Sequence, residues 1–131
     1  MLKFEGQFSN GKRNGKGREY DNNGLLYFEG EYLNGKRNGK GKEYSDGVLI
    51  YEGEYLNGEM HDKFKKYDSD GYLMYDGEYL NDKLNVRFYK KGIFISETKL
   101  MTEDKNLPLE GKLMYLYKKL IQKRIEYEEE I

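Results

Sequence analysis

The chain has no cysteine and no tryptophan, and only one histidine and one proline among its 131 residues. Without cysteine there is no disulfide framework and no thiolate nucleophile, which fits a reducing compartment. No apolar run approaches the roughly 20 residues of a membrane-spanning helix, and the N-terminus shows no signal-peptide pattern. A net charge of −1 gives the molecule no general attraction for nucleic acid. We therefore expect a cytoplasmic protein, with a membrane surface or the cytoskeleton as candidate locations.

Residues that carry catalysis or bind metals are also scarce. His61, the only histidine, has no cysteine or second histidine to complete a metal-ligand set. Gly15-Lys16-Gly17 and Gly39-Lys40-Gly41 resemble fragments of phosphate-binding loops, but they lack the full spacing and a following helix. No set of nucleophile, base and orienting group can be assembled. The sequence predicts a protein that is not an enzyme and has no catalytic residues, metal or cofactor.

What the chain does have is an internal repeat. The segment Phe4-Glu5-Gly6-Gln7-Phe8 returns with conservative changes beginning at Phe28, Tyr51 and Tyr75, at spacings of 24, 23 and 24 residues. Self-similarity at such a period indicates stacked supersecondary units. Hydrophobic content is 37%, but 14 tyrosines and 6 phenylalanines offer large rings to bury, and a repeat unit need only cover its neighbours. We predict a repeat array.

Each unit has the pattern of a β-hairpin. Phe28, Gly30 and Tyr32 alternate with glutamates, which places the apolar residues on one face of a half-buried strand. Asn34-Gly35 begins a turn, and we expect the loop to run to about residue 38. Cross-strand Glu–Lys pairs are then expected on the exposed face.

The return strand has glycine at two inward positions. Gly39 and Gly41 alternate there with lysines that point outward. Glycine weakens a strand unless a close approach requires it, so these positions predict aromatic rings that lie over glycine backbone. The simplest interpretation of the rings is the core of the array, and an aromatic groove for a ligand is the alternative.

The recurring pattern Tyr/Phe-x-Gly-x-Tyr/Phe-x-x-Gly-x-x-x-Gly-x-Gly resembles the MORN repeat (membrane occupation and recognition nexus). The first two repeats match it throughout, at Phe4, Gly6, Phe8, Gly11, Gly15 and Gly17 and at Phe28, Gly30, Tyr32, Gly35, Gly39 and Gly41. The family's usual tryptophan is replaced by Phe8, Tyr32, Tyr55 and Tyr79, and later repeats put Asp62, Phe64, Val86 and Phe88 where glycines are expected. The resemblance covers about residues 2–95. It implies a scaffold or interaction module, and lipid headgroup binding is also proposed for the family.

The fold class we predict is mainly β: a single-layer antiparallel array of β-hairpins over 1–101, a linker over 102–109 and a C-terminal α-helix over 110–131. Residues 92–100 align with 47–55 and form half of a fifth unit that lost its glycine and aromatics. Leu113, Leu116, Tyr117, Leu120 and Ile121 form one apolar stripe on the helix. This helix either caps the last hairpins or associates with a partner.

The function we predict is binding of a protein partner through the aromatic face, because such residues are enriched in interface hot spots. The candidate contact residues are Tyr27, Tyr32, Tyr55, Tyr72 and Tyr79. The alternative is an anionic phospholipid surface bound by basic hairpin turns. Its candidate residues are Lys12, Arg13, Lys36 and Arg37. A homodimer is also expected, through the free N-terminal edge strand or the helix stripe.

Overall fold

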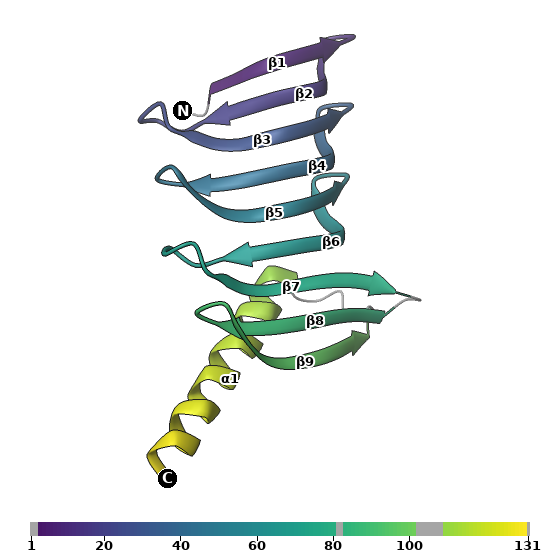
Figure 1. Ribbon diagram of the computed structural model, residues 1–131. Coiled ribbons are helices and arrows are strands. Elements are labelled where there is room, and N and C mark those ends of the chain that lie inside the picture. Colours follow the sequence, from purple (N-terminus) through teal and green to yellow (C-terminus); the bar gives the residue numbers. More distant parts are fainter. Residues whose placement is uncertain (1–2, 81–82, 102–108, 131) are drawn as a thin grey trace.

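A computed structural model describes residues 3–80, 83–101 and 109–130 of the chain. The strands are β1 (Lys3–Ser9), β2 (Lys12–Tyr20), β3 (Leu26–Leu33), β4 (Lys36–Ser45), β5 (Val48–Leu56), β6 (Glu59–Tyr67), β7 (Leu73–Leu80), β8 (Lys83–Lys90) and β9 (Ile93–Met101), followed by helix α1 (Leu109–Glu130). All nine strands form one antiparallel sheet in sequence order (Figure 1). The predicted mainly-β hairpin array with a C-terminal helix is confirmed.

The hairpin turns are shorter than the sequence suggested. Asn34 and Gly35 have φ values of 51° and 87°, and β4 already starts at the next residue. Two consecutive positive φ values define the tight turn that Asn-Gly favours, because its twist matches that of the strands. The expectation of a loop running to residue 38 was wrong, because the extra residues form a β-bulge in β4. There Glu31 faces residues 38–40, and Gly39 adopts a φ of 104°.

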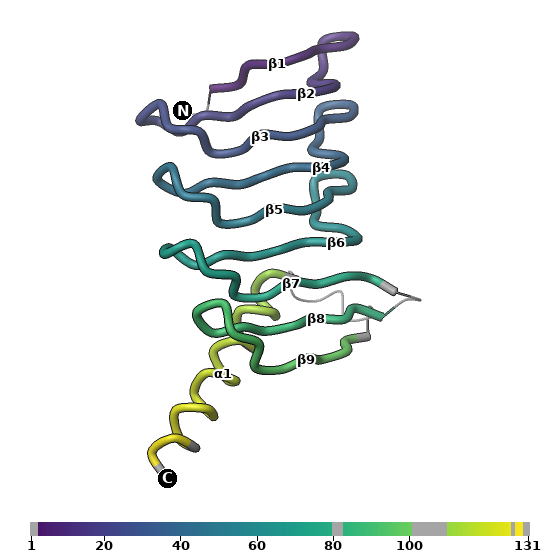
Figure 2. Tube along the Cα trace, in the orientation of Figure 1, coloured from purple at the N-terminus to yellow at the C-terminus, as the bar shows by residue number. Residues whose placement is uncertain are grey.

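The bulges also join each hairpin to the next. The backbone N–H of Asn34 donates to Asn14 Oδ1 at 3.4 Å, and that of Asn57 donates to Asn38 Oδ1 at 3.2 Å. The N–H of Gly35 reaches the carbonyl of Arg13 at 2.9 Å. Successive turns are therefore hydrogen-bonded to the preceding repeat, and the hairpins stack in register (Figure 2).

The core lies on one face of this single sheet and is built from rings. Phe28 packs edge-to-face on Tyr55 with centroids 5.4 Å apart, and Phe4 packs in the same way on Tyr32 at 5.2 Å. The ring contacts continue from β1 to the helix, through Phe4, Tyr32, Phe28, Tyr55, Tyr51, Phe64, Tyr75, Phe88 and Tyr117. Each unit thus buries its aromatics against its neighbours, which is how a repeat array forms a core.

The predicted contact of rings with glycine is confirmed at Gly41. A Cβ built there would lie 2.6 Å from the Phe28 ring and 3.0 Å from Tyr55. The same reasoning was wrong for Gly39, whose built Cβ would instead meet the Glu31 carboxylate. In the later repeats side chains fill this space: Phe64 and Val86, which face Gly53 and Gly77, are 2% and 0% exposed. Phe88, which the sequence placed at this position, instead faces Tyr75.

Helix α1 covers the C-terminal end of the aromatic core. Leu113 is fully buried, the Tyr117 ring lies 6.4 Å from that of Phe88, and Glu110 pairs with Lys66 of β6 at 2.8 Å. Its first half is therefore a cap, while its C-terminal end projects beyond β9 (Figure 1). Among the described residues no helix is long and apolar enough to cross a bilayer. The predicted linker, residues 102–109, lies outside the described residues except for Leu109, where α1 begins.

Candidate interaction groove

A long polar groove runs across the sheet on the face opposite the aromatic core. Its floor is the sheet backbone at a row of positions that are glycine in every strand from β1 to β7 except β6, and we call it the glycine row. Its members are Gly6, Gly17, Gly30, Gly41, Gly53 and Gly77. In β6 the position is Phe64, whose side chain is buried in the aromatic core on the other face. Because adjacent strands lie about 4.8 Å apart, a groove across nine strands is about 38 Å long.

One wall of the groove is a line of charges that change sign at every strand. We call it the first charged row, and its members are Glu5, Arg18, Glu29, Lys42, Glu52, Lys65, Asp76, Arg87 and Glu97. Arg18 lies 3.6 Å from Glu29, and Arg87 lies 3.3 Å from Asp76. Opposite charges on facing positions of antiparallel strands stabilise the sheet modestly, by about 0.2–1 kcal/mol a pair. The predicted Glu–Lys pairing is confirmed and extends over the whole sheet.

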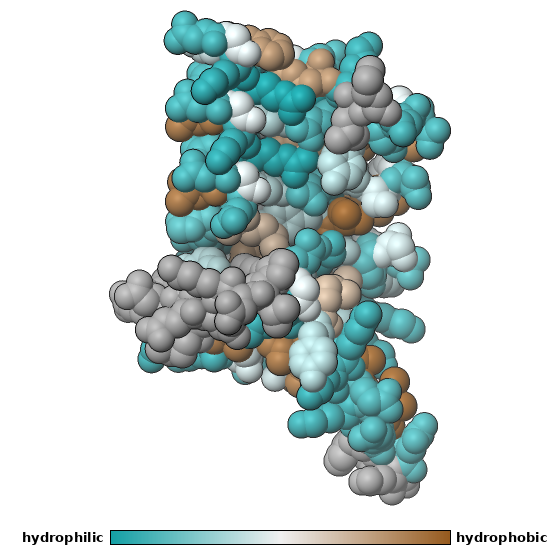
Figure 3. All heavy atoms as spheres, turned by 180° about the vertical axis from the view of Figure 1, so that it is seen from behind, coloured by the Kyte–Doolittle hydropathy of each residue, from teal (hydrophilic) through white to brown (hydrophobic). Residues whose placement is uncertain are grey.

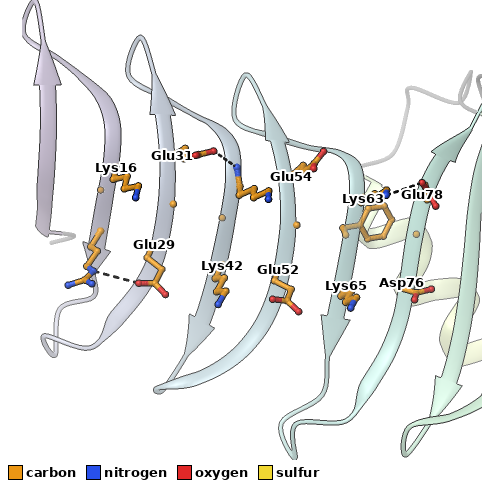
Figure 4. Close-up of a pocket in the computed structure, with 18 of the residues that line it drawn as sticks. Lys16, Glu29, Glu31, Lys42, Glu52, Glu54, Lys63, Lys65, Asp76 and Glu78 are labelled. Atoms are coloured by element: carbon orange, nitrogen blue, oxygen red, sulfur yellow. Dashed lines mark hydrogen bonds and ion pairs between the residues drawn. The ribbon is translucent and has the colours of Figure 1, made fainter.

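The other wall is a second line of alternating charges. We call it the second charged row, and its members are Lys16, Glu31, Lys40, Glu54, Lys63 and Glu78, continued by Asn85 and Lys99. Lys63 pairs with Glu78 at 3.4 Å. Figure 4 shows the two rows on either side of the glycine positions. Residues two apart on one strand share a face, so the rows stand about 7 Å apart.

The groove is almost neutral although most of its side chains are charged. Seven basic and eight acidic residues line it. Its charges are already balanced along each wall, so it has no single-sign field to attract a polyanion or a polycation. Its lining offers both signs of charge along its length.

Tyrosine hydroxyls hold the acidic members of the first charged row in place. Tyr20 donates to Glu5 at 2.6 Å, Tyr44 donates to Glu29 at 2.8 Å, and Tyr67 donates to Glu52. Burial and the bond to Glu29 raise the pKa of Tyr44 to about 12. These tyrosines recur at the repeat spacing, yet the sequence reasoning missed their role, because it treated the acidic face as simply solvated.

The bulges fix part of the second wall in a similar way. The backbone N–H of Lys40 donates to Glu31 Oε2 at 2.7 Å, and that of Lys16 donates to Gln7 Oε1 at 2.8 Å. In the third repeat, a side-chain hydrogen bond with Asp62 raises the pKa of Glu54. Acceptors held by backbone or by a neighbouring carboxyl are preorganised, which lowers the entropic cost of binding.

The five tyrosines predicted as partner contacts do not form one surface. Tyr32 and Tyr55 are 4% and 5% exposed and belong to the aromatic core, so they have almost no surface to offer a partner. Tyr79 is half-buried against that core. Tyr27 and Tyr72 are exposed, at 38% and 47%. The sequence alone could not distinguish exposed rings from buried ones. In the structure, ring contacts between repeats bury Tyr32 and Tyr55.

The four basic residues predicted as lipid contacts fall into two groups, two exposed lysines and two arginines that cover core rings. Lys12 and Lys36 are exposed at the ends of the hairpins. Arg37 instead lies over the Phe28 ring, 3.8 Å from its centroid, and binds Glu19 and Glu43. Arg13 lies 4.2 Å from the centroid of Phe4. Both arginines cover core rings, and the sequence reasoning missed this because it placed them in a loop.

Among residues 3–80, 83–101 and 109–130 no cluster of three or more His, Cys, Asp or Glu could hold a metal ion. His61 is exposed, and its ring stacks on Tyr79 at 6.0 Å.

The comparison with known families agrees with this geometry. The family model of the MORN repeat matches residues 4–25, 28–48 and 51–61. The chain is a MORN-repeat protein. The same hairpin geometry continues from β6 to β9 beyond these matches, where Phe64 and Val86 replace the glycines. A search of curated proteins found no significant match. MORN modules are generally interaction or scaffold domains and are typically non-catalytic, and no catalytic family was found.

Proposed function

We propose that this MORN array is a non-enzymatic scaffold that binds a segment of a protein partner in the polar groove. The observation that carries the proposal is the pair of alternating charged rows over a glycine floor. The floor is sheet backbone, because side chains at its positions point to the aromatic face. A partner can therefore approach it closely, and the walls offer donors and acceptors at a fixed repeat. This relocates the expected protein partner from the aromatic face to the opposite face.

The chemistry of the groove specifies the kind of partner. A near-neutral lining of mixed sign favours a segment that alternates acidic and basic side chains, because each wall position then meets its complement. A groove of about 38 Å accommodates about 25 residues of helix or about 11 residues of extended chain. Complementary charges of this kind set specificity and register more than raw affinity.

The aromatic face is less suited to a partner in the first repeats. The rings there are covered by arginines: Phe28 has no exposed surface because the Arg37 guanidinium lies over it. On the side shown in Figure 3 the surface is mostly hydrophilic, and its hydrophobic side chains form small separate patches. Small scattered patches are ordinary on a protein surface and mark no interface by themselves.

Peptides that bind the whole chain are first selected from a random display library. The test then compares how tightly two double variants of the protein bind these peptides. Lys42→Gln/Lys65→Gln neutralises two exposed lysines of the first charged row. Lys12→Gln/Lys36→Gln neutralises two exposed lysines outside the groove and is the matched control. We expect the first variant to weaken binding about tenfold or more and the control to bind like the wild type. Equal binding by both variants would refute the groove as the docking site.

The same variants examine the lipid alternative. The wild-type chain and both variants are mixed with vesicles that contain anionic phospholipid, at low and at high salt. Basic turns on an anionic surface would give binding that salt weakens and that Lys12→Gln/Lys36→Gln removes. Vesicle binding with that signature, together with failure to select any peptide, would favour the lipid function.

A further inference from the structure

We propose that the outer edge of β9 is a docking site for a second copy of this chain, which pairs with it strand to strand around a two-fold axis at Thr98. This inference is independent of the groove's partner. It starts from the position of β9, which is the last strand of the sheet and pairs only with β8 among the described residues. It has nine residues and no proline. A long unprotected edge is a template for another strand.

The side chains of β9 are complementary to themselves. Glu97 ends the first charged row and Lys99 continues the second, and both are exposed on the groove face. A two-fold axis at Thr98 places Glu97 of each copy opposite Lys99 of the other, so the contact contains two Glu–Lys pairs. Each charged row then meets the other row of the second copy, with opposite charges facing each other at the junction. Opposite charges on directly facing positions favour this register over its neighbours.

Neighbouring registers of β9 lack this match, and the edge at β1 offers it only over a shorter stretch. Moving the axis by one residue to Glu97 would place that carboxylate against its own copy. On β1 an axis at Phe4 would also pair Lys3 with Glu5, but it would overlap only residues 3–5 of the described strand, whereas the axis at Thr98 overlaps residues 95–101. A head-to-tail contact that continued the first charged row would bring Glu97 against Glu5 of the next copy. Like charges directly opposite each other are destabilising.

The projecting helix provides a second contact. Leu120 packs on the core, but the same helical stripe continues through Ile121 and Ile125, and Ile125 is 37% exposed. The C-terminal end of α1 lies beyond β9 in the stacking direction of the strands (Figure 1). A second sheet that pairs with β9 extends in this same direction. Its core face lies on the same side as α1. The apolar stripe that has no sheet beneath it in one copy would then cover the sheet of the other.

The decisive test uses charge reversal on one strand. Light scattering across a concentration series should show the wild-type chain at twice its 15.6 kDa mass. Glu97→Lys places two lysines opposite two lysines, and Lys99→Glu places two glutamates opposite two glutamates. Each single variant should dissociate about tenfold or more readily than the wild type. An equimolar mixture should form a heterodimer, because each lysine then faces a glutamate.

The controls make every outcome informative. Glu5→Lys changes the same charged row at the opposite edge and should leave the dimer intact. Circular dichroism of each variant establishes that it is folded before its mass is interpreted. A wild-type monomer at all soluble concentrations would overturn the proposal. So would a Glu97→Lys dimer as tight as the wild type, or single variants that stay monomeric when mixed.

Discussion

The guanidinium carbon of Arg37 lies 3.8 Å from the centroid of the Phe28 ring, and the same side chain binds Glu19 at 2.6 Å and Glu43 at 3.0 Å. A single-layer sheet has no second layer to cover its core face. In the first repeats the planar arginine provides that cover, because its face stacks on the ring while its edge donates to carboxylates. In the later repeats Met60 and Leu84 occupy the equivalent register position.

Arg37→Ala should lower the free energy of unfolding by about 2–4 kcal/mol, because it uncovers Phe28 and removes a partner of the buried Glu19 carboxylate. Chemical denaturation measures the change. Lys36→Ala, at the exposed neighbouring position, is the control and should change stability by less than about 0.5 kcal/mol. Equal effects of the two substitutions would show that the arginine does not cover the core.

Gly41→Val should lower stability by about 1–3 kcal/mol through overpacking, since even a Cβ at this position lies 2.6 Å from the Phe28 ring. Gly111→Ala on α1 is the matched control, because a Cβ there meets nothing within 4 Å. That control should be neutral or stabilising by up to about 1 kcal/mol, given the helix preference of alanine. An unchanged denaturation midpoint for Gly41→Val would mean that the space over the glycine is open.

Alkaline pH should unfold the protein through its buried tyrosines. Burial raises the pKa of Tyr51, Tyr55 and Tyr75 well above the ordinary value. The unfolded chain loses these protons near pH 10 while the folded chain keeps them, so stability falls as pH rises above about 10, by up to about 1.4 kcal/mol per pH unit for each tyrosine.

Two tyrosine-to-phenylalanine variants separate the effect of tyrosine deprotonation on stability from the effect of losing a hydrogen bond. The Tyr51 hydroxyl has no hydrogen-bond partner among the described residues, whereas that of Tyr55 donates to Glu43 at 2.6 Å. Tyr51→Phe should therefore keep or raise stability at neutral pH and reduce the alkaline slope. Tyr55→Phe should cost about 1–3 kcal/mol at neutral pH. Denaturation midpoints from pH 7 to 12 measure both, and an unchanged slope for Tyr51→Phe would contradict the account.

Leu113→Ala should loosen the helix from the last hairpins and lower stability by about 2–4 kcal/mol, because the side chain is fully buried. Limited proteolysis should then cut the chain within 109–130 first. Tyr115→Ala, at a position that is 59% exposed on the same helix, should leave the cleavage rate close to that of the wild type. Identical protection of all three proteins would mean that α1 is held by contacts other than Leu113.

The hairpin array could be predicted well from the sequence, because the repeats can be aligned with one another. The spacing of Phe4, Phe28, Tyr51 and Tyr75 indicates the stacking, and the alternation within each strand indicates the two faces. The prediction was weaker where one residue type can serve two purposes. Gly39 was expected to make room for a ring, but its positive φ serves a bulge. This cannot be read from glycine alone, since both uses require the same residue.

The candidate site was harder to predict, because it depends on register. The glutamates and lysines are visible in each repeat, but their alternation over nine strands follows only when Gly17 is paired with Gly30 and Gly30 with Gly41. The turn length decides that register, and the sequence reasoning made the turn too long. Likewise, which of the repeated tyrosines is core depends on ring contacts between repeats, and these put Tyr32 and Tyr55 inside.

The most direct test of the central claim, that the polar groove is the surface that binds a protein partner, is a chemical-shift map of the amide groups with a selected peptide. The account predicts that the largest shifts fall along the groove, at Gly17, Gly41 and Lys42 and their neighbours on adjacent strands. Shifts confined to the exposed Tyr27 and Tyr72, or to the turns that carry Lys12 and Lys36, would contradict it.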